Sequence, residues 1–336
     1  MFDSQAFAVN NFILDKVCYE YFPVASKEDT LTHICFNVND TFFRQMCVAA
    51  TSVIENNPGR KFCFHVFCDG AQSLSLARVK ETAAKYRQNF YVYTMDMRPF
   101  QAFHLKVARF SRITYLRIVM PKILRSLTDR YIYMDADMIC VGDITQLRDI
   151  DLKGYPLAAV SETPESVKFK VSFLKMRSGK YFNDGIMLVD IAKWEELQIT
   201  EQVFAYQGAD PKRFTGQSQD LLNLVLDGEI LFIARKFNQF ADKPIPPDTL
   251  IYHFLGRDKP WDMVVCEADK VWRHYLELSV WENLTDPMPP KKPKYYHNYK
   301  RLMKLDLDRG SYLSAALNAI WYAILKIAFC ASGKKS

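Results

Sequence analysis

One stretch of the chain indicates both its fold and its chemistry: Arg130-Tyr131-Ile132-Tyr133-Met134-Asp135-Ala136-Asp137. The β-branched and aromatic run predicts a buried strand, and two carboxylates follow it directly. At the carboxyl end of a strand, carboxylates two residues apart can both face a ligand in the crevice beside the sheet. A hard divalent ion is held by one or two carboxylates when diphosphate oxygens fill its other positions. By itself, the pair also fits a solvated acidic loop.

The composition is that of an ordinary globular protein with an ample core. The chain has 336 residues, of which 49% are hydrophobic and 24% charged, and its net charge is +6. This length allows one large domain or two. The eight cysteines include no C-x-x-C pair and mostly lie in apolar runs, so we expect reduced, buried thiols. The first residues show no basic region followed by an apolar segment, so we expect no signal peptide and a cytosolic protein.

Strand-like and helix-like segments alternate between residues 32 and 254, which favours an α/β sheet. Residues 1–30 are expected to be an irregular lead-in, residues 31–281 the main domain, and residues 282–336 a tail. Pro121 predicts a helix start or a kink, and residues 161–180 form a polar stretch. The expected strands are 32–38, 61–68, 90–94, 130–134, 156–160, 185–190, 229–234 and 250–254. The expected helices are 41–56, 71–86, 113–126, 192–206 and 219–226.

A further candidate metal ligand is His253, at the end of an expected strand. An imidazole nitrogen beside two carboxylates makes a mixed ligand set that suits Mn²⁺ as well as Mg²⁺. Gly256 would let backbone approach a diphosphate, and Lys259 would supply a point charge for it. A half-buried loop histidine is the alternative, but the glycine and the lysine at these offsets favour the ligand.

Two further segments place polar groups at the start of regular elements. Asn183 and Asp184 precede Gly185 where an apolar strand opens, so they can read the hydroxyls of a sugar or form an ordinary turn. Residues 217–223 open a helix, with Ser218 as the expected N-cap. Capping alone would also explain the polar side chains there.

Together these segments resemble glycosyltransferase family 8, and within it the bacterial lipopolysaccharide-core hexosyltransferases. The resemblance extends over residues 32–261, with a weaker match in the tail. Its most specific pieces are residues 133–137, residues 181–183 with Gly185, Gln219-Asp220, and residues 253–256 with Lys259-Pro260-Trp261. It implies a GT-A catalytic domain, a Rossmann-like α/β fold of nucleotide-diphospho-sugar transferases, over residues 31–281. It also implies transfer of galactose or glucose from UDP-galactose or UDP-glucose, with retention of the α configuration, using Mn²⁺ or Mg²⁺.

The resemblance implies three groups of site residues, each carried over by position. The metal and diphosphate group consists of Asp135, Ala136, Asp137, His253, Gly256 and Lys259. The uridine group consists of Phe36, Asn37, Val38, Asn39 and Phe42, with Phe42 stacking on the base. The donor-sugar group consists of Arg117, Glu162, Asn183, Asp184 and Gln219, with Gln219 beneath the anomeric carbon.

Two positions depart from the usual pattern of the family. Asn39 stands where an acid is common, which would weaken a hydrogen bond to uracil, and Ser218 replaces the first acid of an Asp-Gln-Asp pattern. Gln219 is a poor nucleophile because a neutral amide carries no charge. We therefore expect same-face attack through an oxocarbenium-like transition state, with UDP accepting the proton of the acceptor. Asp220 and Asp184 are the carboxylates that would serve instead if a covalent nucleophile is used.

The C-terminal tail suits a protein whose acceptor is a membrane lipid. The prolines within residues 286–290 (Pro287, Pro289 and Pro290) break regular structure, a basic and aromatic stretch follows, and residues 312–329 are largely apolar. Ser314, Asn318 and Lys326 interrupt the apolar segment, so we expect an interfacial helix rather than a span. This predicts a cytoplasmic protein, peripheral on the inner face of the bacterial inner membrane, that binds anionic lipid and glycosylates the outer core of lipopolysaccharide in α-1,2 or α-1,3 linkage. A helix packed on the catalytic domain is the alternative.

Other classes of protein explain less of the sequence. A metal-dependent sugar nucleotidyltransferase also needs paired carboxylates and a diphosphate site, but it would release pyrophosphate and favour a Gly- and Lys/Arg-rich first loop, which residues 36–40 do not form. A catalytically silent lectin-like module is a third possibility. No nucleic-acid-binding motif accompanies the local basic cluster, so no nucleic-acid partner is expected.

Overall fold

The computed structural model describes residues 12–24, 31–105, 111–209, 213–240, 244–256, 259–262, 264, 266–281 and 295–331. The chain forms two compact units. The first comprises Met1–Gln239 and Asp248–His253, and the second comprises Phe240–Pro247 and Phe254–Ser336. The predicted boundary between residues 281 and 282 lies inside the second unit, next to a stretch outside the described residues. The three-part division therefore stays a prediction.

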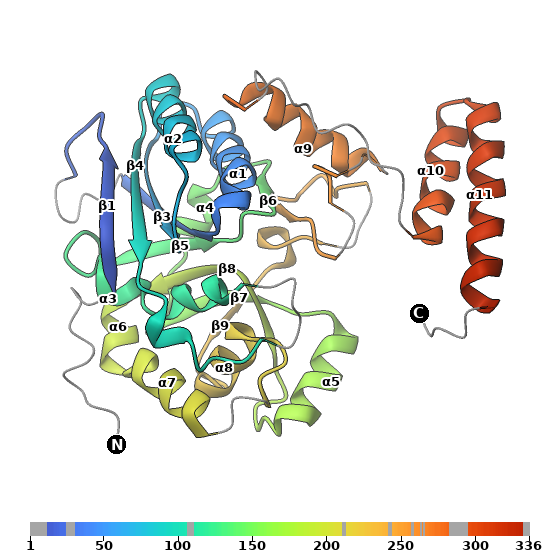
Figure 1. Cartoon of the computed structure of the whole chain (residues 1–336). Helices are drawn as coiled ribbons and strands as arrows, with labels where there is room; N and C mark the ends of the chain where they lie inside the picture. The colour runs from blue at the N-terminus through green and yellow to red at the C-terminus, as the bar shows by residue number, and fades with distance from the viewer. Residues whose placement is uncertain are drawn as a thin grey trace. The chain divides into compact units, whose positions relative to one another are not determined.

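Within the first unit, the described residues form a mixed eight-stranded sheet in the order β1-β4-β3-β2-β5-β8-β7-β9 (Figure 1). A separate two-stranded sheet pairs β10 with β6. The strands are β1 (Ile13–Tyr19), β2 (Leu31–Val38), β3 (Lys61–Cys68), β4 (Asn89–Met95), β5 (Arg130–Met134), β6 (Met138–Cys140), β7 (Leu157–Ser161), β8 (Phe182–Asp190), β9 (Leu231–Ile233) and β10 (Ile251–His253).

Helices cover both faces of the large sheet. Their bounds are η3 (Asp40–Phe42), α1 (Phe43–Glu55), α2 (Ser73–Tyr86), η4 (Arg98–Phe100), η5 (Arg112–Ile118), α3 (Met120–Leu124), α4 (Thr145–Arg148), α5 (Pro164–Leu174), α6 (Ile191–Glu196), α7 (Ile199–Ala209), α8 (Ser218–Val225) and η7 (Arg235–Phe237). Every residue of β2 is buried, as expected for a parallel strand that is covered on both sides. On one face, Cys35 and Tyr93 join a core cluster with Tyr115 and Trp194. The opposite face of β2 packs against α1.

The strand order reverses beside β2. The chain runs outward from β2 through the parallel strands β3 and β4, and it then returns to β5 on the other side of β2, again in parallel. In open α/β sheets, ligands bind in the crevice at the carboxyl ends of the strands where such a reversal occurs. Asn39 follows β2 there and Asp135 follows β5, so two of the sequence-predicted site segments meet at this edge.

Two local expectations are wrong, and a third segment, for which no element was expected, contains a helix. The lead-in is not irregular throughout, because Ile13–Tyr19 forms β1, which pairs antiparallel with β4 and closes one edge of the sheet. The polar stretch 161–180 contains helix α5, which Thr163 caps by accepting a hydrogen bond from the backbone N–H of Ser166. The expected helix over 192–206 is divided into α6 and α7 at Gln198, whose φ is +50°.

The cysteines agree with the expectation of free thiols. All eight are free, and five of them are buried: Cys35, Cys47, Cys63, Cys68 and Cys140. In contrast, Cys18 and Cys330 are exposed.

The second unit contains α9 (Glu267–Leu278), α10 (Tyr296–Asp308) and α11 (Tyr312–Ala331). Trp272 of α9 is fully buried and packs on Trp261, with ring centroids 5.5 Å apart. Helices α10 and α11 form an antiparallel pair (Figure 1). The hydroxyl of Ser314 and the amide of Asn318 both donate to Asp306 of α10, at 2.6 and 2.7 Å. Two of the residues that interrupt the apolar segment of α11 are therefore turned toward α10.

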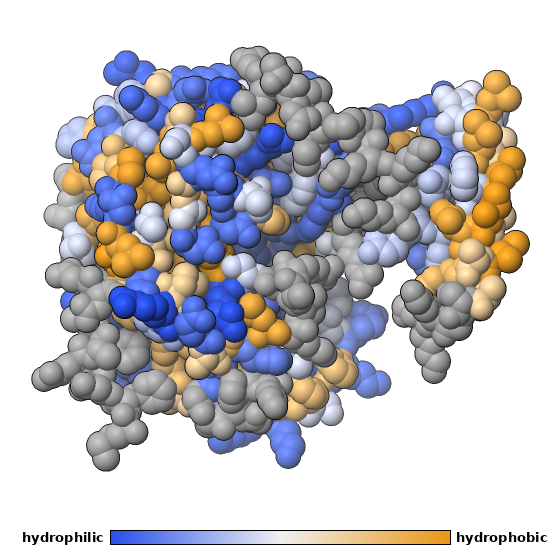
Figure 2. All heavy atoms as spheres, in the orientation of Figure 1, coloured by the Kyte–Doolittle hydropathy of each residue, from blue (hydrophilic) through white to orange (hydrophobic). Residues whose placement is uncertain are grey.

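The side of α11 that faces away from α10 is apolar and exposed, as Figure 2 shows. The helix is long and apolar enough to cross a membrane by length and composition, with a mean hydropathy of 1.6 in a window that is only 6% buried. Its exposed apolar residues recur every three or four positions: Leu313, Leu317, Ile320, Ile324 and Ile327.

Candidate active site

Asp135, Asp137 and His253 come together in the first unit, with one potential ligand atom from each lying within 4.8 Å of the others. Nε2 of His253 is 3.1 Å from Oδ1 of Asp137. The imidazole is 3% exposed, whereas the side chains of Asp135 and Asp137 are 26% and 19% exposed. One side of the cluster is thus fixed in the protein interior, and the other side is open to a ligand.

Pairing of the small sheet brings His253 to the carboxylates. Strand β6 begins at Met138, directly after Asp137, and its register places Met138 opposite His253 of β10. Gly185 of β8 makes room for the imidazole, because a β-carbon at that position would lie 2.6 Å from Cε1 of His253. A residue 116 positions downstream of Asp137 is thereby held at the end of β5.

Two asparagines orient the His253 ring. Nδ1 of His253 is 3.2 Å from Oδ1 of Asn238, and the amide of Asn238 donates to Oδ1 of Asn183 at 2.8 Å. With the amide in this orientation, Nδ1 donates to Asn238 and Nε2 faces Asp137. A metal ion between Nε2 and the carboxylate oxygen would be bound by both. The donor set, two carboxylates and one imidazole, therefore fits a divalent ion such as Mg²⁺ or Mn²⁺.

Arg117 is the buried cation of the site. Its guanidinium donates to Oδ2 of Asp184 at 2.7 Å and to Oδ1 of Asp135 at 3.0 Å, and it lies 4.3 Å from the ring centroid of Tyr133. Burial alone would lower the pKa of Arg117, but Asp184, Tyr133 and Asp135 hold it above its ordinary value. The Tyr133 hydroxyl donates to Asp135 at 2.5 Å. Two hydrogen-bond donors, Arg117 and Tyr133, thus orient the Asp135 carboxylate.

Asp184 has an unusual protonation equilibrium. Burial raises its pKa to about 6, against the opposing effects of the Arg117 charge and of the Ser218 hydroxyl, which donates to Asp184 at 2.8 Å. The predicted N-cap role of Ser218 is wrong, because Gln217 precedes α8 and the hydroxyl of Ser218 points to Asp184 instead. Asp184 lies within β8, not ahead of it as expected, so its side chain is held by the sheet.

A polar wall extends from Asp184 along β8 and α8. Oε1 of Glu162 accepts from the amide of Asn183 at 2.7 Å and from the amide of Gln219 at 3.3 Å, and Oε1 of Gln219 accepts from the backbone N–H of Asp184 at 3.3 Å. Glu162 and Gln219 are partly exposed. The residues expected to read the donor sugar therefore form one hydrogen-bonded group.

Asp220 has a different environment. It is fully buried and accepts hydrogen bonds from the Tyr181 hydroxyl at 2.5 Å, from Nζ of Lys170 at 2.8 and 2.9 Å, and from the backbone N–H of Gly216 at 2.6 Å. These donors anchor the start of α8 to α5 and β8. A role as an alternative nucleophile does not fit a carboxylate with no exposed surface.

The residues expected at the uridine site lie at the end of β2, with different exposure. Phe36 and Val38 are buried core residues, so only their backbone can reach a ligand. The amide of Asn37 donates to the carbonyl of Ile113 at 2.7 Å, and its oxygen lies beside the Tyr133 hydroxyl. Asn39 is partly exposed, with its side-chain oxygen accepting from the Thr41 hydroxyl at 2.7 Å, and Phe42 is 36% exposed, so both side chains reach the surface.

Gly256 and Lys259, expected at the diphosphate, belong to the second unit. Gly256 has a φ of +94°, which favours glycine. Nζ of Lys259 donates to the carbonyl of Phe254 at 2.5 Å and lies 5.5 Å from the Trp261 ring centroid. Their role at the diphosphate stays a prediction.

Four residues of the site gave no functional signal in the sequence. Asn238 lies in an irregular segment, and Lys170 lies in a helix that the sequence did not predict. Tyr133 and Tyr181 belong to segments that carry the resemblance, but nothing in the sequence indicated their hydrogen-bond partners. Pairwise partners of this kind become visible only when the sheet brings distant segments together.

Comparison with known proteins agrees with this fold and site. The model of Glycosyl transferase family 8 matches residues 33–264, more than half of the chain. The chain therefore belongs to glycosyltransferase family 8. A lipopolysaccharide 1,2-glucosyltransferase of Escherichia coli (strain K12) is 25% identical over 311 residues, which cover 88% of this chain and 90% of that protein. A lipopolysaccharide 1,3-galactosyltransferase of Salmonella typhimurium is 30% identical over 247 residues, which cover 68% of this chain and 72% of that protein.

The fold has solved counterparts. The galactosyltransferase LgtC, in complex with donor and acceptor sugar analogues, superposes with a TM-score of 0.65 at 23% sequence identity, covering 78% of this chain and 98% of that chain. The expected family, the GT-A class of α/β fold and the assignment as a hexosyltransferase enzyme are thereby confirmed.

Replacing Lys170 by methionine should destabilise the protein because it leaves the fully buried Asp220 without its cation. Breaking one partner of a buried ion pair costs about 3–5 kcal/mol. We expect the lower end, about 3 kcal/mol, since Tyr181 and Gly216 still donate to Asp220. Urea unfolding measures the change, and Lys168→Met, at an exposed position two residues earlier on α5, is the matched control. Equal stability of the two variants would contradict the structural role of Asp220.

The Asp184 carboxyl should make stability depend on pH. Its pKa in the folded protein, about 6, is above the ordinary value of 3.8, so the fold favours the neutral form. This contribution is complete below about pH 4 and is lost as the pH rises through about 6. Relative to Asp184→Asn, the free energy of unfolding of the wild type should therefore fall between about pH 4 and pH 7. Urea titrations at a series of pH values measure the difference, and a constant difference would refute the prediction.

Proposed function

We propose that the protein is a metal-dependent, retaining α-glycosyltransferase that moves galactose or glucose from a UDP-sugar to the outer core of lipopolysaccharide, in α-1,2 or α-1,3 linkage. The observation that carries the proposal is the Asp135–Asp137–His253 cluster at the reversal of strand order. The names of the relatives support the acceptor class and both hexoses, since one is a glucosyltransferase and the other a galactosyltransferase of lipopolysaccharide.

Asp135, Asp137 and His253 would hold the ion, with Asn238 and the Arg117–Tyr133 pair setting the direction of their ligand atoms. When bound, Mn²⁺ or Mg²⁺ supplies Lewis-acid stabilisation of the negative charge that develops on the leaving diphosphate. Arg117 offsets the charge of Asp135 and Asp184 in the protein interior, which keeps two carboxylates near each other before a donor arrives. Asn39 and Phe42, the exposed side chains at the end of β2, would receive the uridine.

Gln219, Glu162 and Asn183 would position the donor sugar. Their mutual hydrogen bonds fix an amide and a carboxylate on the same wall, where hydroxyl groups of a hexose can both donate and accept. Gln219 carries no charge, Asp220 is fully buried, and Asp184 is buried and paired with Arg117, so none of the three offers an exposed carboxylate for a covalent intermediate. This favours attack by the acceptor on the face that the diphosphate leaves, with the diphosphate taking the proton.

The second unit would attach the enzyme to the membrane that carries its acceptor, on the cytoplasmic face of the inner membrane. Helix α11 presents an exposed apolar side, and Lys300, Arg301 and Lys304 of α10 are exposed. Basic residues near an anionic surface contribute about 1 kcal/mol each. Because Ser314 and Asn318 are turned toward Asp306, the apolar side of α11 is less interrupted than its sequence suggests.

A nucleotidyltransferase would release pyrophosphate, so the leaving group separates the two candidate functions. We expect the purified chain to release UDP from UDP-glucose or UDP-galactose in the presence of a truncated lipopolysaccharide core and Mn²⁺, and to lose this activity in EDTA. His253→Ala should reduce kcat/KM by at least about 100-fold at limiting metal, because removing a ligand weakens the site, and high Mn²⁺ should restore part of it. A coupled UDP assay measures both effects.

His274→Ala is the matched control, since this histidine lies on α9, outside the metal cluster. It should leave the metal dependence unchanged. Release of pyrophosphate instead of UDP, or no product with either donor and any core acceptor, would refute the proposed function. Activity of His253→Ala that equals the wild type at limiting metal would refute the ligand role alone.

The membrane role predicts that charge on the apolar side of α11 weakens binding to membranes. The side chains of Leu317 and Ile324 are 61% and 49% exposed, and each would contribute about 2 kcal/mol when buried in a lipid interface. Leu317→Asp/Ile324→Asp should therefore lower the partitioning into anionic vesicles by more than about 10-fold. Cosedimentation with vesicles of phosphatidylglycerol and phosphatidylethanolamine measures it. Leu74→Asp, at a 53% exposed leucine of α2, should bind as the wild type does; equal binding of all three proteins would contradict the prediction.

A further inference from the structure

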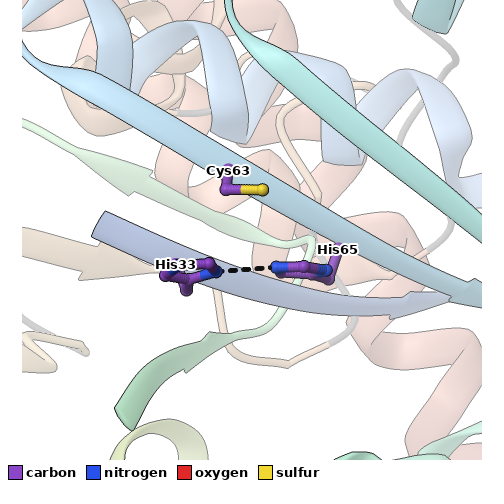
Figure 3. Close-up of side chains that lie close together, drawn as sticks. All are labelled: His33, Cys63 and His65. Atoms are coloured by element: carbon purple, nitrogen blue, oxygen red, sulfur yellow. Dashed lines mark hydrogen bonds between the residues drawn. The ribbon is translucent and has the colours of Figure 1, made fainter. Parts of the chain in front are cut away.

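A second group of ligand-type side chains lies inside the large sheet. His33 of β2 and Cys63 and His65 of β3 have one potential ligand atom each within 4.8 Å of the others. Figure 3 shows the two imidazoles edge to edge, joined by a hydrogen bond, with the sulfur of Cys63 beside them. Nδ1 of His33 is 2.9 Å from Nε2 of His65. All three residues are buried, with exposures of 6%, 0% and 0%.

Strand register explains the cluster. Alternate residues of a strand point to the same face, so the pair Cys63 and His65 lies on one face of β3. The parallel register places His33 opposite Cys63 and Cys35 opposite His65. Two histidines and two thiols therefore alternate on neighbouring strands, within a core face that is otherwise apolar and aromatic.

The second ring nitrogen of His65, which faces away from His33, has a hydrogen-bond partner in Tyr93. Nδ1 of His65 is 3.1 Å from the hydroxyl of Tyr93. Metal-binding histidines usually use their second nitrogen in a hydrogen bond of this kind, which fixes the ring and its tautomer. With the proton on Nδ1 and bonded to the Tyr93 oxygen, Nε2 of His65 accepts the hydrogen bond from Nδ1 of His33, so a metal ion would take the place of the shared proton.

The distances are compatible with a metal ion of the zinc class. Zinc binds nitrogen at about 2.0–2.1 Å and sulfur at about 2.3 Å, which places two nitrogens of a tetrahedral site about 3.3 Å apart. The two imidazole nitrogens, now 2.9 Å apart, would need to separate by a few tenths of an ångström, and the rings, whose planes now differ by 12°, would need to tilt so that both nitrogens face the ion. Imidazole and thiolate are the ligands that favour zinc and cuprous ions over Mg²⁺ or Mn²⁺.

We propose that His33, Cys63 and His65 form a buried binding site for a thiophilic transition-metal ion of the zinc class, independent of the Asp135–Asp137–His253 cluster. Asn39, which follows β2 at the ligand-binding edge, is six positions after His33, a distance of about 20 Å along the strand direction. The ion would tie β2 to β3 in the middle of the sheet. Its role would be structural, because no member of the cluster is exposed enough to meet a substrate.

Proton and charge balance follow from the ligands. Burial raises the pKa of the Cys63 thiol, so the thiol is neutral without metal and releases one proton when the ion binds. The proton between the two rings moves to the outer nitrogen of one imidazole, so no further proton is lost. Nearby, Lys16 lies 4.8 Å from the Tyr91 ring centroid, and Glu20 accepts from the Tyr91 hydroxyl. The thiol of Cys35, opposite His65, is the group that could supply a second negative charge.

Cobalt substitution tests the site without any assay of activity. The full-length chain would be expressed in minimal medium that contains Co²⁺ in place of zinc, and its near-ultraviolet spectrum recorded. We expect thiolate-to-cobalt charge-transfer absorption from about one equivalent of Co²⁺, displaced by added Zn²⁺. The Asp135–Asp137–His253 cluster contains no sulfur and cannot give this band, so the test does not depend on the proposed function.

Three variants test which residues bind the cobalt that gives the absorption band. Cys63→Ser should abolish it, His33→Gln should reduce bound cobalt by at least about 10-fold, as loss of one ligand does, and Cys68→Ser should leave it unchanged. Cys68 is the matched control, a buried thiol on the same strand whose side chain lies on the other face. Absence of the band from the folded wild type, or its persistence in Cys63→Ser, would overturn the proposal. The wild-type spectrum decides the question even if a variant does not fold.

Discussion

The buried guanidinium of Arg117 is the interaction on which the rest of the site depends. Two carboxylates, Asp135 and Asp184, come from neighbouring strands into one interior, and without a cation their repulsion and desolvation would oppose folding. Arg117 bonds to both, and its planar fork also lies against the Tyr133 ring. A lysine could not make both contacts with fixed geometry. Two carboxylates can therefore lie at the ligand-binding edge of the sheet because a single arginine from η5 offsets their negative charge.

Much of the fold could be predicted because its signals are local. The apolar runs of β2, β3 and β5, and the turn from β5 into Asp135, need no knowledge of distant residues. Strand β1 escaped prediction because an edge strand is half exposed and lacks a continuous apolar run. The break at Gln198 between α6 and α7 depends on a positive φ that no composition rule signals in glutamine. Helix α5 was hidden by its charged and polar surface.

The candidate site was predictable in its residues but not in their partners. The resemblance identified Asp135, Asp137 and His253, and the structure brings these three side chains together. It did not indicate that Asn238 orients His253, or that Lys170 forms an ion pair with Asp220. Ser218, where the family usually has an acid, donates to Asp184. A hydroxyl at that point leaves one negative charge fewer beside a carboxyl whose pKa is already raised. Such partners are properties of three-dimensional packing, so one sequence alone cannot supply them.

The late position of His253 in the chain has a consequence for synthesis. Asp135 and Asp137 leave the ribosome long before His253, and β10 can pair with β6 only after the intervening segments have been made. Domains fold as units while the chain grows at about 5–20 residues per second. For several seconds the nascent protein therefore carries two carboxylates without the imidazole. A divalent ion held by all three ligands, as proposed here, would be captured firmly only after His253 has been made, so its capture would mark the end of assembly of the first unit.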